Sequence, residues 1–211
     1  LDVVGRLEKV SRGKGVNANH GAGELLKLMN QMAAGSNKAK EDILLGSYDA
    51  DTELLFVESK RLLYTSQIFE RNPRLGMLFV ATYVFMKKYT LGTKLFGMAE
   101  DTFWIMVQWL IGILGKSVGS GHNYISRAFL IAQSDTFDTS EDEAQACIIT
   151  ELGYKVGNFR GAMIGHGAEH TLETANNPLP KWAAGLLDLI RFKWKTTFTS
   201  KNVGLGVKLT I

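Results

Sequence analysis

The sequence contains little of what is typical of secreted proteins. Its 211 residues include a single cysteine, Cys147, so no disulfide can form within the chain. Residues 1–20 do not form a signal-peptide pattern, because basic residues interrupt each short apolar stretch. We therefore expect an intracellular protein in a reducing compartment, or a component of a virion if the protein is viral.

Long apolar runs are also missing. The two longest, residues 77–86 and 103–114, are roughly half the length needed to cross a bilayer, and each contains a polar side chain. We interpret both as core helices and expect no membrane span, with an amphipathic or re-entrant pair as the alternative.

Proline is scarce, with three residues in the chain, which leaves room for long helices. Ser140 followed by Glu143 forms a capping box, which predicts a helix to residue 152. Asp49 or Asp51 caps a predicted helix that stops before Pro73. Spacing and capping signals together predict helices over residues 52–70, 75–86, 104–114, 124–133, 141–152 and 181–195.

Only the last residues show the period of a strand, because apolar residues occupy every second position of 203–211. The predicted fold class is therefore mostly α, with a helical core of one or two lobes. We divide the chain into a mobile or extended segment with a short helix (1–35), a helical core (36–195) and an extended C-terminal arm with one short strand (196–211). We expect the arm to lie along its own domain, to dock on a neighbouring copy or to be disordered.

Charge is distributed in blocks that the formal net charge of +3 conceals. The blocks 1–40, 41–59, 60–95, 96–130, 131–180 and 181–211 sum to +4, −6, +6, 0, −6 and +5. Opposite blocks can pair within one fold or between copies, and a basic face suits a polyanion.

Residues 191–195 alternate cations with large aromatic residues. Cations bind phosphates and aromatic rings stack on unpaired bases, so this pattern fits a single-stranded nucleic acid. The alternative is a helix end whose cations reach solvent while its aromatic residues pack in the core. The predicted nucleic-acid site comprises Arg12, Lys14, Arg71, Arg74, Lys87, Lys88, Arg127, Arg160, Arg191, Lys193, Trp194, Lys195 and Lys201.

A second candidate site consists of His166, Glu169, His170 and Glu173. On a helix these spacings place two imidazoles and two carboxylates on one face, which suits a metal ion. A solvated face with His–Glu pairs explains the same pattern without any metal.

These observations favour a structural protein over an enzyme. We expect a nucleocapsid- or coat-type subunit without a cofactor. It would bind single-stranded RNA largely without sequence preference and assemble with copies of itself through residues 196–211. The alternatives are a helical metal-dependent enzyme that uses the His/Glu face and a helical scaffold that binds other proteins.

Overall fold

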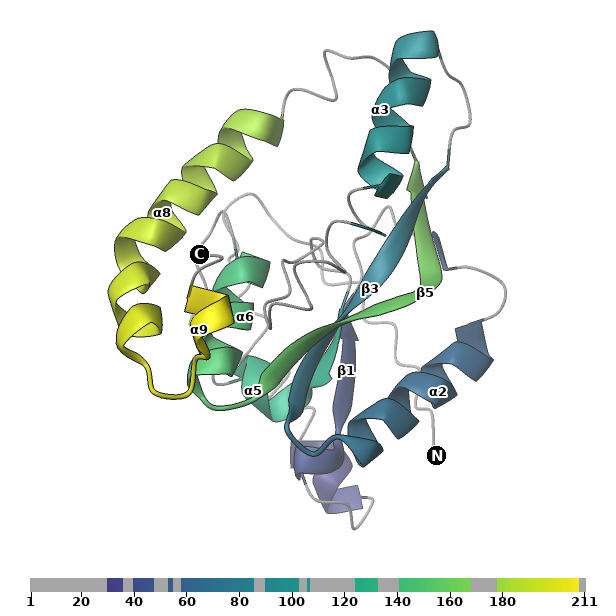
Figure 1. The fold of residues 1–211 in the computed structure, drawn as a ribbon. Coiled ribbons are helices and arrows are strands. Elements are labelled where there is room, and N and C mark those ends of the chain that lie inside the picture. Colours follow the sequence, from purple (N-terminus) through teal and green to yellow (C-terminus); the bar gives the residue numbers. More distant parts are fainter. Residues whose placement is uncertain are drawn as a thin grey trace.

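A five-stranded mixed sheet forms the centre of the protein in the computed structural model (Figure 1). The strands are β1 (Leu44–Ser47), β2 (Glu53–Leu54), β3 (Leu75–Phe85), β4 (Tyr124–Arg127) and β5 (Lys155–Gly167). Their order is β1-β4-β3-β5-β2, with β3 and β5 parallel and the other neighbours antiparallel. The structure describes residues 30–35, 40–47, 53–54, 58–85, 90–102, 106, 124–132, 141–167 and 178–208.

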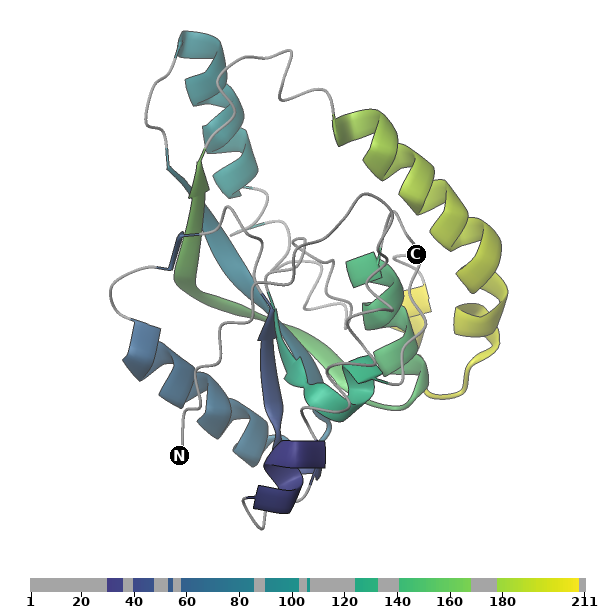
Figure 2. The ribbon, with the colours of Figure 1, turned by 180° about the vertical axis from the view of Figure 1, so that it is seen from behind.

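Helices cover both faces of this sheet. They are η1 (Lys40–Asp42), α2 (Glu58–Arg71), α3 (Leu91–Thr102), α5 (Ala128–Ala132), α6 (Glu141–Glu151), α8 (Pro178–Thr199) and α9 (Leu205–Lys208). Helix α2 lies on one face and α5 with α6 on the other, while α8 lies outside α6 (Figures 1 and 2). Helix α3 contacts β3 and lies at the end of the molecule away from η1 (Figure 1).

Side chains of β3 alternate between two cores. Leu78 and Val80 pack with Phe69 of α2, whereas Met77 and Phe79 pack with residues of α5 and α6. Successive residues of a strand point to opposite faces, so a strand covered on both faces is apolar at nearly every position. The core therefore lies on both sides of the sheet.

Gly76 lies where β3 approaches α5 and α6 closely. A Cβ atom on Gly76 would come within 2.7 Å of side-chain atoms of Leu130 and Ile149 and within 2.9 Å of the Cβ of Tyr154. Real Cβ atoms do not approach other atoms so closely, so this crossing requires glycine. The pairing of β3 with β5 is also irregular between Leu75 and Met77.

The prediction of a mostly α fold is wrong, and residues 75–86 show why. This apolar run was expected to be a helix, but its residues 75–85 form β3. An apolar run that is buried all round has the same pattern in a helix as in a strand covered on both faces. The β-branched and aromatic residues of this run favour the strand, and the sheet around it decides the outcome.

The predicted helix 124–133 is also wrong in its first half. Tyr124–Arg127 form β4, a fully buried strand between β1 and β3, and only then does the helix α5 begin. Lys155–Gly167 form β5, a strand that the sequence analysis did not predict. The protein is therefore mixed α/β.

The extended C-terminal arm with a strand is the third correction. Residues 196–199 continue α8, and Leu205–Lys208 form the short helix α9. Between them the Val203 side chain is buried, and the Asn202 amide donates a hydrogen bond of 2.7 Å to the Glu151 carbonyl oxygen. This anchored turn fixes the chain against α6, so the alternation at 203–211 does not produce a strand within the described residues.

Two helix ends that depend on local signals are confirmed, whereas the predicted helix start at residue 52 is wrong, because Glu53–Leu54 form β2 and α2 begins at Glu58. Helix α2 ends before Pro73, and α6 ends at Glu151, two residues before Gly153, whose φ is 90°. The Gly153 and Tyr154 amides donate to the carbonyl oxygens of Thr150 and Ile149, which is the Schellman arrangement. The division of the chain at residues 35 and 195 stays a prediction, although α8 passes through the second boundary.

Candidate nucleic-acid interface

Two cations meet where β3 and β5 begin. Parallel strands start at the same edge of a sheet, and Leu75 pairs there with Lys155. The Lys155 amide donates a hydrogen bond of 2.7 Å to the Arg74 carbonyl oxygen, so Arg74 and Lys155 are neighbours across the pair. Both side chains are exposed.

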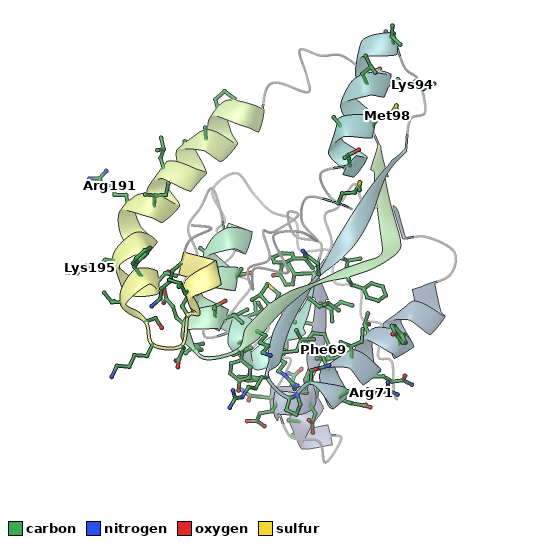
Figure 3. The ribbon with its side chains drawn as sticks, viewed as in Figure 1. Phe69, Arg71, Lys94, Met98, Arg191 and Lys195 are labelled. Atoms are coloured by element: carbon green, nitrogen blue, oxygen red, sulfur yellow. The ribbon has the colours of Figure 1, made fainter. Side chains whose placement is uncertain are left out.

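Helix α2 places a third cation beside them. Phe69 is buried under the sheet, and the Asn72 side-chain amide donates to the Ile68 carbonyl oxygen at 2.8 Å, which closes the last turn. Arg71 lies in this last turn with its side chain exposed (Figure 3). Arg71 and Arg74 are thus held close together by a helix end and a tight turn.

The turn after α8 brings a fourth cation from the end of the chain. The Thr197 hydroxyl donates a hydrogen bond of 2.7 Å to the Glu151 carboxylate, and the Asn202 amide binds the Glu151 carbonyl oxygen. Asn202 also lies against Gly153, two residues before Lys155. Lys201, exposed on this turn, therefore lies near the segment that leads into β5. We call Arg71, Arg74, Lys155 and Lys201 the basic edge.

Acidic residues border the basic edge on one side. Glu41 and Asp42 of η1 and Glu70 of α2 are exposed. The guanidinium of Arg127 joins η1 to the end of α2, so these three acids lie on the Arg71 side. A polyanion is repelled there, and the favourable path runs over Arg74, Lys155 and Lys201.

Arg127 itself lies in the interior and not on the basic edge. Its guanidinium donates hydrogen bonds of 2.8, 2.8 and 3.1 Å to the carbonyl oxygens of Leu75, Glu41 and Phe69. It also lies 5.7 Å from the centre of the Phe69 ring, within the range of a cation–π contact. The side chain is 9% exposed. Arg127 thus ties β3, η1 and α2 together, and its donors are directed inward.

Helix α8 carries further predicted site residues. Arg191 and Lys195 are exposed and point away from the body of the molecule (Figure 3). Lys193 and Trp194 lie in the same helix and Arg160 in β5, but their side chains are outside the described part of the structure. Predicted residues that lie wholly outside it are Arg12, Lys14, Lys87 and Lys88.

Of the His/Glu candidate, only His166 lies in the described part of the structure. His166 lies in β5, opposite Val84, so helical spacing does not relate it to the residues that follow. Glu169, His170 and Glu173 lie outside the described residues. Among the described residues, no group of three His, Cys, Asp or Glu side chains is placed to hold a metal ion.

Lys155 is the member of the basic edge that the sequence analysis missed. It lies in a block with a net charge of −6, where an isolated lysine is expected to pair with a nearby acid. Only the parallel pairing of β3 with β5 places it beside Arg74, which comes from a basic block. No local signal in the sequence carries this information.

Comparison with known proteins does not assign the chain to a family. No protein-family model matches the chain, and no curated protein is significantly similar to it in sequence. In the part of the chain that the structure describes, every helix is too short or too polar to cross a membrane.

Proposed function

We propose that this protein binds single-stranded RNA along the basic edge, with little preference for sequence, as a nucleocapsid- or coat-type subunit. One observation supports this proposal above the others. Four exposed cations from three distant parts of the sequence gather at one end of the sheet, and two of them are joined through a backbone hydrogen bond. A flexible polyanion can follow such a row without any base being read.

The mechanism is neutralisation of phosphates by the basic edge. Arg71 and Arg74 present planar guanidinium groups that suit phosphate oxygens, while Lys155 and Lys201 act as point charges. Each phosphate that is neutralised releases bound counterions, so the affinity falls as salt rises. Base stacking on Trp194 stays a prediction.

Packaging also requires several copies on one RNA, and we propose that this protein associates with itself on the nucleic acid. Exchange of an extended C-terminal arm is not part of this proposal. Thr197 and Asn202 attach that end of the chain to its own α6. Light scattering of the protein with and without a long RNA measures the association, and a particle mass equal to one copy for each RNA contradicts it.

The test of RNA binding is a fluorescence anisotropy titration with a labelled, unstructured oligoribonucleotide at several salt concentrations. Four phosphate contacts predict that the logarithm of affinity falls against the logarithm of salt with a slope of about −3. The Arg74→Gln/Lys155→Gln double variant is expected to bind roughly tenfold more weakly at low salt, and with a shallower slope.

A matched control distinguishes an effect of the basic edge on RNA binding from a general effect of removing positive charge. Lys94 is an exposed cation on α3, away from the basic edge (Figure 3), so Lys94→Gln should bind as the unmodified protein does. Absence of binding at low salt contradicts the proposal. Equal losses in the Lys94 variant and the double variant contradict the location of the site.

A further inference from the structure

Helix α8 exposes an apolar stripe to solvent. Leu187 is 67% exposed, Ile190 42% and Phe198 37%. At 3.6 residues per turn these three positions lie within about 80° of one another around the helix axis. Ala183 and Ala184, which are also exposed, extend the stripe toward the start of the helix. Side chains of this size are normally buried, so three of them exposed on one face of a helix indicate a contact surface.

Among the described side chains, one that attaches α8 to the rest of the protein is Thr197, which is 1% exposed and hydrogen-bonded to Glu151 of α6. In Figures 1 and 2, α8 is the outermost helix on its side of the molecule, with α6 between it and the sheet. The stripe is therefore accessible along most of its length.

Basic residues accompany the stripe. Arg191 and Lys195 are exposed, and Arg191 lies one turn after Leu187. The whole helix contains four Lys or Arg residues against a single acid, Asp188. An apolar face flanked by cations is the pattern of helices that lie in the interface of a membrane with anionic lipids.

Charge and chemistry favour a membrane with anionic lipids over two other binding partners for the stripe. A second copy that presents its own α8 brings cations against cations, which opposes association. RNA neutralises Arg191 and Lys195 but leaves the aliphatic side chains of Leu187 and Ile190 in water, because bases stack on aromatic rings. An anionic lipid surface can bind both the cations and the apolar stripe. Its headgroups contact the cations, and its acyl chains surround the apolar side chains.

We propose that α8 is an interfacial helix that binds the protein to membranes containing anionic lipids. The helix lies parallel to the membrane plane with Leu187, Ile190 and Phe198 inserted and with Arg191 and Lys195 at the headgroups. In this arrangement α8 does not cross the bilayer. The basic edge does not include these residues, so membrane binding and RNA binding are separable properties.

The test uses flotation of the full chain with vesicles of phosphatidylcholine alone and with about one third phosphatidylserine. Binding is expected to the anionic vesicles and to weaken with salt. The Leu187→Gln/Ile190→Gln variant should reduce the partition coefficient by about tenfold or more, because two apolar side chains no longer insert. Lys195→Gln should reduce binding to anionic vesicles by about fivefold.

Two controls make these results specific. Leu205→Gln changes an exposed leucine of α9 outside the stripe and should leave flotation unchanged. Lys155→Gln changes a cation of the basic edge and should weaken RNA binding more than vesicle binding. Circular dichroism and a thermal melt establish that each variant folds, which is expected because all the substituted side chains are exposed.

Several results overturn the proposal. It fails if the protein does not float with anionic vesicles, or if Leu205→Gln reduces flotation as much as the double variant. It also fails if the double variant floats normally but binds RNA more weakly, since the stripe then belongs to the RNA site. Loss of self-association in the double variant, with no vesicle binding by the unmodified protein, assigns the stripe to a contact between copies.

Discussion

Leucine side chains of β3 and α3 differ in their exposure to solvent. Leu78 in β3 is 4% exposed and packs against α2, whereas Leu95 in α3 is 59% exposed. The same contrast holds between the sheet around Leu75–Val80, where helices pack on both faces, and the two outer helices α3 and α8 (Figure 1). The apolar residues of this part of the sheet form the core, while several described apolar residues of the outer helices are exposed. The outer residues are therefore candidates for binding partners.

The largest effect is expected from the arginine that ties the sheet to its surroundings. Arg127→Met removes three hydrogen bonds from a charged donor and leaves the carbonyl oxygens of Leu75, Glu41 and Phe69 without it. We expect the free energy of unfolding to fall by about 3 kcal/mol or more. Urea denaturation measures the change.

Arg71→Met is the matched control, because Arg71 lies near the same helix end and is exposed. It should change stability by less than about 0.5 kcal/mol. Similar losses in both variants would show that Arg127 does not hold the interior in the way described.

The next effect concerns the crossing of β3 over α5 and α6. In Gly76→Ala the new methyl group overlaps the side chains of Leu130 and Ile149, so we expect a loss of about 1–3 kcal/mol. Gly204→Ala, where nothing lies within 4 Å of the added Cβ, should lose less than about 0.5 kcal/mol. Thermal melts of the two variants decide the matter, and equal midpoints would contradict the close approach.

The smallest effect is expected from an exposed leucine of α3. This prediction tests the contrast between β3 and α3 most directly. Leu95→Ala should change stability by less than about 0.5 kcal/mol, because its side chain is mostly in water. Leu78→Ala makes the same deletion in the core and should cost about 2–5 kcal/mol. If Leu95→Ala proves as costly as Leu78→Ala, then α3 is part of the core in solution.

Local signals in the sequence predicted the helices better than the sheet. The C-terminal end of α2 and both ends of α6 follow from Pro73, Gly153 and a capping box, whose effects extend over one turn. Strands depend on partners that are distant in the chain. Residues 75–85 have a pattern that fits a buried helix equally well, and β5 contains several glycines that obscure its apolar residues.

The residues of the candidate site were likewise predicted only where local sequence determines their position. Arg71 and Arg74 were predicted, since they flank a proline that exposes them at a turn. Lys155 was missed because its neighbour in space is not its neighbour in sequence. Arg127 was included among the phosphate ligands because an isolated arginine in a neutral stretch, beside Ser126, can hold a phosphate bidentately. Its burial depends on β1 and β3, which the sequence analysis did not foresee.

The parallel pairing of β3 with β5 has a consequence for how the chain reaches this fold. Between Phe85 and Lys155 the chain leaves the sheet, returns as β4 and forms α6 before its next parallel strand begins. Contacts so far apart in sequence form slowly, because a long loop must close before they contribute any stability. During synthesis on the ribosome, β3 emerges long before β5 and keeps an unpaired edge until that strand follows. A chaperone that covers this apolar strand would shield it from aggregation during that interval.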